Sequence, residues 1–296
     1  MLISTVICTH NRSNILKICL EHVQKQDLPK NDFEIIIINN NSTDTTEDVA
    51  QDFIIKNEHS LNIRYYFEGK PGLSAARNRG VIESKGDFIN FIDDDALLPK
   101  EYLSNLKKNI VQLDNSLFAG IGGKIIPRYF GHEPEWMSYF TWGLVSKHDL
   151  GEKQMKYEKI GLYPTGCNMT YKKTILQKVG LFDEALLRRC DDKYIAYEIK
   201  KYGGEIWYCP DVALEHFIDE DRINNRLDNI CFDSGLHEKL RIRNNGYYAQ
   251  ILKFTEYIFK FFSSFLLLAY YSLKSQPKKG LVLVKMRWLF LIGFIK

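Results

Sequence analysis

The stretch Phe88–Ala96 reads FINFIDDDA, in which a short run of strand-forming residues ends in Asp93, Asp94 and Asp95. A buried strand cannot leave three carboxylates without partners, because each would lose its hydration without compensation. A divalent cation is the simplest partner, since it takes oxygen ligands from closely spaced Asp residues and often binds together with phosphates. The alternative is a helix N-cap with spare surface acids. We expect the metal site, because one cap needs fewer than three acids.

Strands and helices alternate around this stretch. Strands are expected at 3–8, 34–38, 63–67 and 88–92, separated by helices at 15–23, 46–55 and 73–83. Each strand is an almost continuous apolar run, which is typical of a parallel sheet covered by helices on both faces. Ligands of such sheets bind beyond the carboxyl ends of the strands. Polar residues follow the first, second and fourth strands, so the sequence predicts one nucleotide-sized site there.

Two common nucleotide-binding motifs are missing from the chain. The segment after the first strand is ICTHNRSN, which contains no GxGxxG, and no GxxxxGK[ST] occurs anywhere in the sequence. A Rossmann dinucleotide site and a P-loop both lose their main support. The expected site is therefore one built from side chains at strand ends.

The composition is typical of a globular protein from a reducing compartment. Of the 296 residues, 45% are apolar and 13% aromatic. The six cysteines lie far apart with no CxxC pair, so we expect neither disulfides nor a zinc site. The N-terminal MLISTVICTHNR has no basic segment before its apolar residues, which argues against a signal peptide and for a cytoplasmic location.

The C-terminal segment differs in charge from the rest of the chain. Residues 251–296 contain eight Lys or Arg and one Glu, a net charge of +7, which leaves −4 for residues 1–250. Apolar residues recur there at helical spacing, but no run reaches the length of a membrane-spanning helix. Basic amphipathic helices are typical of the surface of an anionic membrane. An oligomer contact or a helical cap on the catalytic domain would use the same pattern.

Seven segments together resemble those of family 2 glycosyltransferases. In chain order they are STVICTHNR, EIIIINNNSTD, GLSAARNRG, GDFINFIDDDA, GCNMTYKK, VGLFDE and CDDKYIAYEIKKYG. The resemblance covers residues 1 to about 220. It implies an α/β GT-A (Rossmann-like) fold with a mixed, mainly parallel sheet flanked by helices. It also implies a nucleotide-diphosphate sugar donor, a divalent metal (Mn²⁺ or Mg²⁺) on a DxD motif, and transfer with inversion.

The resemblance assigns roles to particular residues. It places Asp95 on the metal and Asp93 near the metal or the ribose, and it leaves the role of Asp94 within the donor site open. His216 is a candidate third ligand, with a structural histidine as the alternative. The remaining candidates for the nucleotide sugar are Thr9, His10, Arg12, Asn39, Asn40, Arg77, Gly166 and Asn168.

Some of these assignments keep alternatives. Arg77 rather than Arg79 is expected to reach the diphosphate, whereas Arg12 has a structural alternative as a charge near a helix cap. Asn39 and Asn40 stand where the family usually has an Asp, so the nucleobase is open.

Inversion requires a base that takes the proton of the acceptor hydroxyl. The acidic pair Asp191 and Asp192 matches the family's pair at the start of a helix, and the register that runs from Asp192 to Gly203 makes Asp192 the expected base. Asp191 is the second choice, and a helix N-cap is the alternative for both. The aromatic-rich stretch 127–164 is the expected acceptor side, with simple packing as its alternative.

These inferences give a domain plan and a function. Residues 1–245 are expected to form the catalytic domain, with nucleotide-sugar binding in 1–115 and the acceptor and base in 116–245, and residues 246–296 a basic amphipathic tail. The predicted enzyme adds sugars to a glycan or polyprenyl-linked glycan in cell-surface polysaccharide assembly. It would lie in the cytoplasm, peripheral to the inner membrane, and bind no nucleic acid. The alternatives are a nucleotidyltransferase of sugar phosphates and a non-catalytic sugar-nucleotide-binding protein.

Overall fold

The computed structural model describes residues 1–159 and 161–296, so Ile160 of the aromatic-rich stretch lies outside the description. The first part of the chain alternates strands and helices as predicted. Its elements are β1 (Ile3–Thr9), α1 (Ser13–Gln24), β2 (Phe33–Asn39), α2 (Thr46–Asn57), β3 (Ile63–Phe67), α3 (Leu73–Glu83), β4 (Phe88–Asp93), β5 (Ala96–Leu97) and α4 (Tyr102–Leu113).

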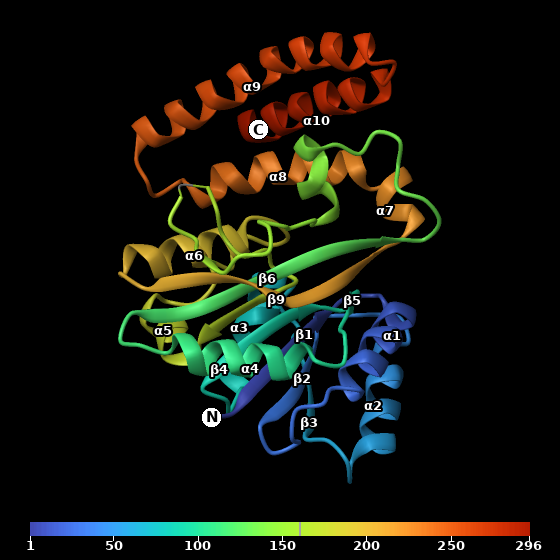
Figure 1. The fold of residues 1–296 in the computed structure, drawn as a ribbon, viewed down its shortest axis with the longest axis vertical. Coiled ribbons are helices and arrows are strands. Elements are labelled where there is room, and N and C mark those ends of the chain that lie inside the picture. Colours follow the sequence, from blue (N-terminus) through green and yellow to red (C-terminus); the bar gives the residue numbers. More distant parts are fainter. Residues whose placement is uncertain (160) are drawn as a thin grey trace. The chain divides into compact units, whose positions relative to one another are not determined.

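The second part is less regular. It contains β6 (Phe118–Tyr129), the 3₁₀ helix η1 (Tyr139–Val145), β7 (Met155–Lys156), β8 (Met169–Lys172), α5 (Lys173–Lys178), α6 (Asp191–Lys201), β9 (Glu205–Ile218), α7 (Glu220–Asn224), α8 (Leu227–Arg241), α9 (Tyr247–Leu273) and α10 (Pro277–Ile295). The strands of both parts join in one sheet, whose helices flank it in Figure 1.

The sheet is mixed, with its parallel strands on one side. Among the described residues its order is β3-β2-β1-β4-β8-β6-β9-β5, and β7 pairs with β9. β1 is parallel to β2 and β4, and β2 is parallel to β3. β8 is antiparallel to β4 and β6, and β5 is antiparallel to β9. The predicted fold class, a mixed and mainly parallel sheet flanked by helices, is thus present in its N-terminal half and extended by antiparallel strands.

The four isoleucines of β2 show why this strand lies inside. Ile35 and Ile37 pack in one apolar cluster with residues of α1, α2 and α4, whereas Ile36 and Ile38 pack in a second cluster with residues of α3, α5 and α6. All four side chains are fully buried. Because neighbouring residues of a strand point to opposite faces, a continuous apolar run is required when helices cover both faces. Each isoleucine contributes about 2 kcal/mol by leaving water.

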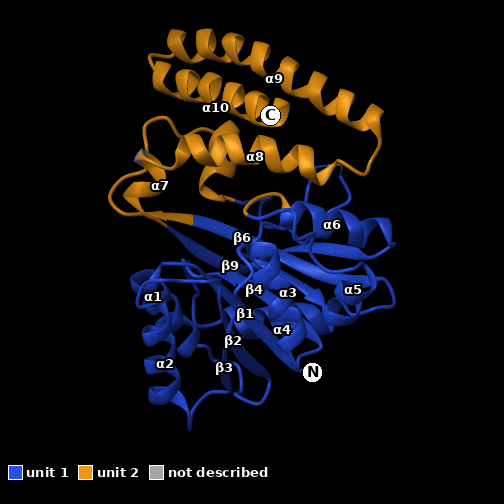
Figure 2. Cartoon of the chain, turned by 180° about the vertical axis from the view of Figure 1, so that it is seen from behind, with its two compact units in different colours: residues 1–126, 148–187, 191–217 blue, residues 127–147, 188–190, 218–296 orange. Residues whose placement is uncertain are grey.

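The chain divides into two compact units (Figure 2). Unit 1 comprises residues 1–126, 148–187 and 191–217 and contains most of the sheet. Unit 2 comprises residues 127–147, 188–190 and 218–296 and contains the C-terminal helices. The domain limits at 115 and 245 that the sequence predicted concern function, and they stay predictions.

Unit 2 is built on close packing of α10 against α8 and α9. A Cβ atom added at Gly235 of α8 would lie 2.1 Å from the backbone oxygen of Phe290, and one at Gly293 of α10 would lie 2.1 Å from that of Phe232. The two helices therefore touch through their backbones at these glycines. An apolar cluster that includes Ile230, Cys231, Leu283 and Met286 fills the same unit.

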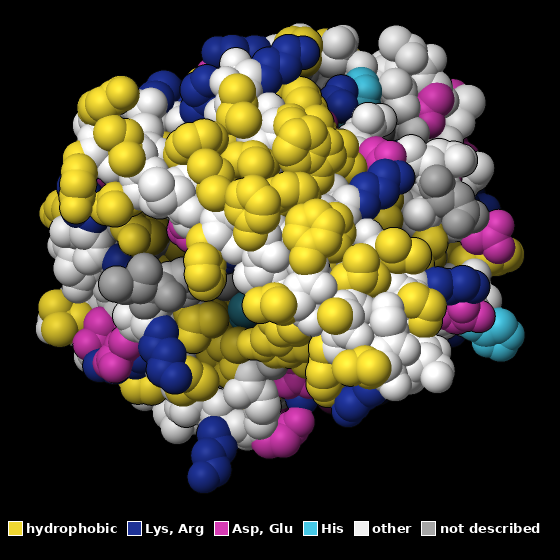
Figure 3. Space-filling view, turned by 90° about the horizontal axis from the view of Figure 1, so that it is seen from above, with side chains coloured by type: hydrophobic (Ala, Val, Ile, Leu, Met, Phe, Trp, Pro, Cys, Tyr) yellow, Lys and Arg dark blue, Asp and Glu magenta, His cyan; other side chains and the backbone are white. Residues whose placement is uncertain are grey.

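One face of unit 2 is strongly apolar. Figure 3 shows hydrophobic side chains gathered on the face seen from above, where α9 lies. None of the described helices is both long enough and apolar enough to cross a membrane. Several aromatic residues of the stretch 127–147 are partly buried: Trp136 and Trp142 pack against Met137, Val145 and Ile218. For these two, the packing alternative is correct.

Candidate active site

The three acids lie where β4 ends, at the carboxyl edge of the parallel strands. Cys8 of β1 is paired with Asp93 of β4, so the loops after both strands meet. Thr9 donates its hydroxyl hydrogen to Asp94 Oδ2 at 2.7 Å. Nη1 of Arg12 lies 2.7 Å from Asp94 Oδ1 and 2.8 Å from Asp95 Oδ2. No described helix begins at these acids, so the N-cap alternative is wrong for them.

The buried members of the triad are held by charge. Asp94 and Asp95 are 3% and 2% exposed. Burial raises the pKa of Asp94 to about 7; the charge of Arg12 opposes this rise, and the charge of Asp95 adds to it. Arg12 is therefore an ion-pair partner of the acids, a role that neither its predicted donor contact nor its alternative as a charge near a helix cap described, and it stays within reach of a ligand because it is only partly buried.

His216 reaches the triad through a short strand pair. β5 follows the acids directly and is antiparallel to β9, with Ala96 opposite His216. The backbone N–H of Phe217 donates to the carbonyl oxygen of Asp95 at 2.9 Å. As a result, Nε2 of His216 lies 3.0 Å from Oδ1 of Asp95, and both side chains are buried. The structure thus brings together the two side chains that the sequence analysis expected on one metal.

Arg77 of α3 joins the triad to the second acidic pair. Its Nη2 lies 3.2 Å from Asp93 Oδ1 and donates to the carbonyl oxygen of Gly166 at 3.0 Å, while Nη1 forms an ion pair with Asp191. Burial disfavours its charge, but Asp191 and then Asp93 outweigh this effect and raise the pKa of Arg77. Arg77 is only 2% exposed, so it holds these partners in position from the interior of the protein. This geometry favours contacts between Arg77 and groups of the protein over the expected direct contact between Arg77 and a diphosphate.

Gly166 makes the position of Arg77 possible. A Cβ atom at this residue would lie 2.7 Å from Nη2 of Arg77, closer than such atoms approach each other. Gly166 also donates its backbone N–H to Asp192 Oδ2 at 3.0 Å. One glycine therefore contacts both the cation and the candidate base.

The two acids at the start of α6 differ in their surroundings. Asp191 is buried against Arg77, whereas Asp192 is partly exposed and accepts backbone hydrogen bonds from Gly166 and Lys193. Burial and then the charge of Asp191 raise the pKa of Asp192 to about 6, against the lowering effect of Arg77. A base needs access to its proton donor and a pKa near the working pH, so the geometry favours Asp192 over Asp191.

Three predicted donor contacts are buried scaffold residues. The amide of Asn40 donates to the carbonyl oxygens of Glu68 and Lys70 and accepts from the backbone of Gly72. Asn39 donates to the hydroxyl of Tyr65 and accepts from the backbone of Ser42. These contacts connect the end of β2 and the loop after it with β3 and the loop after β3.

Asn168 is the third of these residues. It is 1% exposed, accepts from the hydroxyl of Tyr102, and donates to the carbonyl oxygens of Lys124 and Val212. These contacts use both ends of its amide inside the protein. The contacts of Asn39, Asn40 and Asn168 with a donor stay predictions.

One residue at this edge, Asn11, was not predicted. Asn11 accepts from the backbone of Thr43 at 2.7 Å and of Asp44 at 3.3 Å, so it ties the loop after β1 to the loop after β2. His10, a predicted donor contact, is exposed beside this connection, with Nδ1 2.7 Å from the carbonyl oxygen of Asn40. The left-handed φ of 52° at Asn11 is common for Asn and offers a weak signal in the sequence.

The donor atoms at this edge fit a divalent metal. Carboxylates of Asp93 and Asp95 and the imidazole of His216 are ligand types that suit Mn²⁺, and the carboxylates alone suit Mg²⁺. The ligand atoms of Asp93, Cys167 and His216 also lie within 4.8 Å of one another. The sequence analysis did not connect Cys167 with the metal, because its spacing matches no metal motif.

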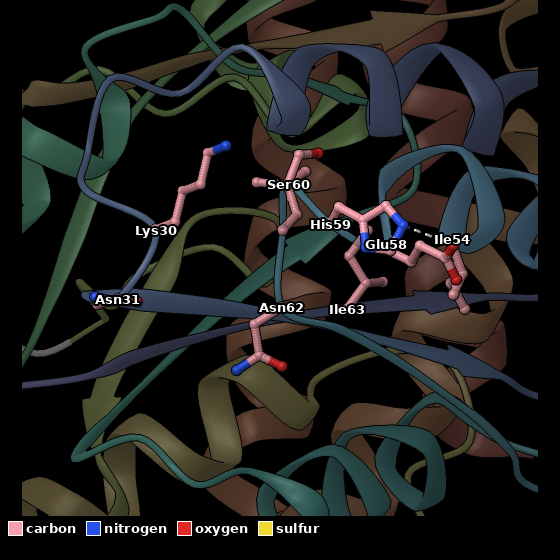
Figure 4. A pocket seen from close by; sticks show the side chains of 9 residues that line it. Lys30, Asn31, Ile54, Glu58, His59, Ser60, Asn62 and Ile63 are labelled. Carbon is pink, nitrogen blue, oxygen red and sulfur yellow. Dashed lines mark ion pairs between the residues drawn. The ribbon is translucent and has the colours of Figure 1, made fainter.

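A pocket of about 480 Å³ lies elsewhere, around the start of β3 (Figure 4). Lys30, Glu58, His59 and Asn62 are among its lining residues, and His59 pairs with Glu58 at 3.2 Å. It contains none of the predicted site residues. Parallel strands bind ligands at their carboxyl ends, and this pocket is at the opposite end of β3.

Comparison with known proteins identifies the family. Residues 4–180, more than half of the chain, match Glycosyl transferase family 2. The chain belongs to this family. The resemblance inferred from the seven segments is therefore confirmed.

Known glycosyltransferases resemble the chain over different lengths. It is 32% identical over 221 residues to a dolichyl N-acetyl-alpha-D-glucosaminyl phosphate 3-beta-D-2,3-diacetamido-2,3-dideoxy-beta-D-glucuronosyltransferase of Methanococcus voltae, with 73% of this chain and 66% of the relative covered. It is 31% identical over 158 residues to glycosyltransferase GlyA of Streptococcus pneumoniae serotype 4, with 53% and 20% covered. The chain thus spans about a fifth of the length of GlyA.

Solved structures share the fold of this family 2 chain. The mannosyltransferase PcManGT of Pyrobaculum calidifontis, in complex with GDP-Man and Mn²⁺, superposes with a TM-score of 0.69 at 15% identity over 99% of this chain and 86% of the other. TarS 1-349 of S. aureus in complex with UDP gives a TM-score of 0.57 at 18% identity over 80% and 65%. At these identities the likeness concerns the fold alone, and it confirms the GT-A prediction.

Proposed function

We propose that this chain is a metal-dependent, inverting glycosyltransferase that moves a sugar from a nucleotide-diphosphate donor to a hydroxyl of a glycan or lipid-linked glycan. One observation carries the proposal: the single guanidinium of Arg77 bridges Asp93 of the DDD motif and Asp191 of the acidic pair. Arg77 thereby fixes the positions of the proposed metal ligands and of the acidic pair relative to each other. A metal-dependent transferase needs the metal at the leaving group and the base at the nucleophile.

Asp95, His216 and Asp93 are the proposed metal ligands. A divalent cation bound there neutralises the charge that develops on the departing diphosphate. The protein contributes orientation: His216 and Asp95 are held by the β5–β9 pair, and Asp93 by Arg77. Arg12 lies on the exposed side of these acids, where it can pair with a phosphate oxygen.

Asp192 is the proposed base. The acceptor oxygen attacks the anomeric carbon, its proton passes to Asp192, and the bond from that carbon to the diphosphate oxygen breaks. Attack opposite to the leaving group inverts the anomeric centre in one step, so no covalent sugar–enzyme bond is needed. Arg77 and the backbone of Gly166 hold the acidic pair in place for this transfer. Asp191 forms an ion pair with Arg77 and so keeps the acidic pair oriented.

The acceptor class rests on relatives. The Methanococcus voltae relative is named for a dolichyl phosphate glycolipid, and a Campylobacter jejuni relative, 29% identical over 126 residues, for a PP-undecaprenol glycan. A Bacillus spizizenii relative is named for poly(ribitol-phosphate). These names support a surface polysaccharide or its lipid-linked precursor as the acceptor of this chain.

The exposed face of α9 supports a place at the membrane. Exposed apolar residues recur along the helix at spacings of three, four or seven positions: Tyr248, Leu252, Phe259, Phe262, Leu266, Tyr270 and Leu273. At 1.5 Å per residue this stripe is roughly 40 Å long. Water would not favour it, whereas the boundary between head groups and acyl chains would, and the half-exposed Lys260 of α9 and Lys274 just after its end suit anionic lipids. We place the protein at the inner face of the cytoplasmic membrane.

Vesicle binding tests that placement. The full chain is sedimented with vesicles of phosphatidylglycerol and with vesicles of phosphatidylcholine. Binding should require the anionic lipid and be lost in a Phe262→Ser, Leu266→Ser double variant, while Ile55→Ser, an equally exposed apolar residue of α2, binds like the wild type. Equal sedimentation of the double variant and the wild type would refute the membrane role of α9.

Donor binding tests the enzyme function. Thermal unfolding is followed with UDP-, dTDP-, GDP- and CMP-sugars, with and without Mn²⁺, since a bound ligand raises the apparent stability. The proposal expects stabilisation by one nucleotide class that depends on the metal. Stabilisation by a nucleoside triphosphate and a sugar phosphate instead would favour a nucleotidyltransferase. Donor binding without transfer to any acceptor, unchanged in Asp192→Asn, would favour a non-catalytic binding protein.

A further inference from the structure

A thiol lies among the proposed metal ligands. Sγ of Cys167, a carboxylate oxygen of Asp93 and a ring nitrogen of His216 are within 4.8 Å of one another. Cys167 and His216 are each 1% exposed, and Asp93 is partly exposed, which leaves a way in for an ion. The three residues come from separate segments: the end of β4, the turn before β8, and β9. The sequence contains no CxxC pair, and we therefore expected no zinc site. Spacing along the sequence cannot reveal a group of ligands that the sheet brings together from separate segments.

This donor set has a different preference from a site of carboxylates alone. Thiolates select zinc and similar soft ions, imidazole suits zinc well, and carboxylates and water suit Mg²⁺ and Mn²⁺. Zinc in proteins is bound by four ligands, at about 2.3 Å from sulfur and about 2.0 Å from nitrogen, so its ligand atoms lie roughly 3.5 Å apart. Small side-chain rotations would bring the three donors to that spacing, and water or Asp95 would complete the four.

We propose that Asp93, Cys167 and His216 bind Zn²⁺ or another thiophilic divalent cation, and that this ion and Mn²⁺ exclude each other. Asp93 and His216 are ligands of both ions in this proposal, and Nε2 of His216 is also 3.0 Å from Asp95. Binding replaces the S–H bond of Cys167 by a sulfur–metal bond and releases the proton to solvent. The proposal that zinc binds here does not depend on the proposed function. The proposal that zinc competes with Mn²⁺ does depend on that function. Cys167 thereby sets the metal specificity of the enzyme.

The test is direct metal binding to the full chain. Titration with Cd²⁺, a spectroscopic substitute for Zn²⁺, should produce a thiolate-to-metal charge-transfer band in the ultraviolet with one ion per chain. Cys167→Ser should lose this band and bind Zn²⁺ at least tenfold more weakly. Cys19→Ser is the matched control, because Cys19 is also buried and its Sγ contacts the backbone oxygen of Asp93 at 3.6 Å without belonging to the ligand group.

Mn²⁺ gives the second readout. The resonance signal of free Mn²⁺ should fall when it binds the wild type and return on addition of one equivalent of Zn²⁺; in Cys167→Ser it should return only at tenfold more Zn²⁺. An unchanged band or equal zinc affinity in Cys167→Ser would overturn the proposal, as would loss of the band in Cys19→Ser. If Cys167→Ser does not fold, Cys167→Ala is used. A cadmium band without any Mn²⁺ binding would leave the zinc site standing and count against the proposed metal-dependent transferase.

Discussion

Nη1 of Arg12 lies 2.8 Å from Oδ2 of Asp95, the carboxylate that we propose as a metal ligand. The same nitrogen also contacts Asp94, so one side-chain cation balances two buried carboxylates. A metal ion at Asp95 would add positive charge close to this guanidinium. Arg12 and the proposed metal would therefore repel each other unless an anion lay between them, so we expect a diphosphate and a metal to bind better together than apart.

Replacing Arg12 should separate these effects. In Arg12→Gln, Mn²⁺ binding without donor should strengthen about tenfold, or about 1.4 kcal/mol, because the competing charge is gone. Donor affinity in the presence of Mn²⁺ should fall. Both are measured by calorimetry on the full chain, with Lys17→Gln, an exposed cation of α1, as the control. Weaker Mn²⁺ binding in Arg12→Gln would contradict the argument.

Arg77 should be essential for the order of the site. Arg77→Lys keeps the charge but cannot bridge Asp93, Asp191 and the carbonyl of Gly166 at once. Breaking a buried ion network costs about 3 kcal/mol, so the unfolding midpoint in urea should drop clearly and transfer should be lost. Arg79→Lys, two residues along the same helix, paired with Glu83 and lying over the ring of Tyr66 near the surface, should leave both unchanged. A stable, active Arg77→Lys would exclude the bridging role.

Two isosteric changes should distinguish base from metal ligand. Asp192→Asn should bind the donor normally and lose transfer by about 10²–10⁴-fold, the usual contribution of a general base. Asp95→Asn should lose the part of donor binding that depends on metal. Donor binding is measured by thermal shift and transfer by release of the nucleoside diphosphate. The same defect in both variants would mean that the roles are assigned wrongly.

The activity should depend on the pH through Asp192. Its pKa is raised to about 6, and only the carboxylate form accepts a proton, so kcat/KM should fall about tenfold per pH unit as the pH drops below about 6. Asp192→Asn should lack this acid limb in its residual rate. Donor affinity, followed over the same range at saturating Mn²⁺, identifies any loss that comes from the metal site instead. An acid limb that persists in Asp192→Asn would belong to another group.

The glycine contact in unit 2 should limit what α10 tolerates. In Gly293→Val the new side chain meets the backbone oxygen of Phe232, so α8 and α10 must separate at a cost of about 3 kcal/mol. Calorimetric melting of the full chain measures the loss. Gly143→Ala, at an exposed glycine with no atom near its Cβ position, is the control and should melt like the wild type. Equal melting of both variants would show that the two helices are not packed on Gly293.

The parallel part of the fold could be predicted because its signals are local. The isoleucines of β2 need two covered faces, and the polar group after each strand marks the carboxyl edge. The acids Asp93 and Asp95 stand at or just after the end of β4, where the pattern directs attention to them, whereas Asp192 was assigned from the family resemblance; the roles of all three stay proposals.

Side chains whose partners are distant in sequence were harder to predict. Arg77 was expected to face the donor, yet its partner Asp191 lies 114 residues away. Asn40 and Asn168 have the right positions for ligand contacts, but their amides satisfy backbone groups of other loops. The position of a residue along a strand can be inferred from the sequence pattern. The direction of a polar side chain depends on which backbone groups elsewhere in the chain still need a hydrogen-bond partner.

The pairing of β5 with β9 has a consequence for synthesis of the protein. The acids at 93–95 leave the ribosome long before His216, which docks beside them only when β9 has formed. A nascent chain can complete its parallel strands early and still lack His216, one of the proposed metal ligands. If the proposed metal site is correct, products truncated before residue 216 would retain the parallel strands but bind the metal poorly.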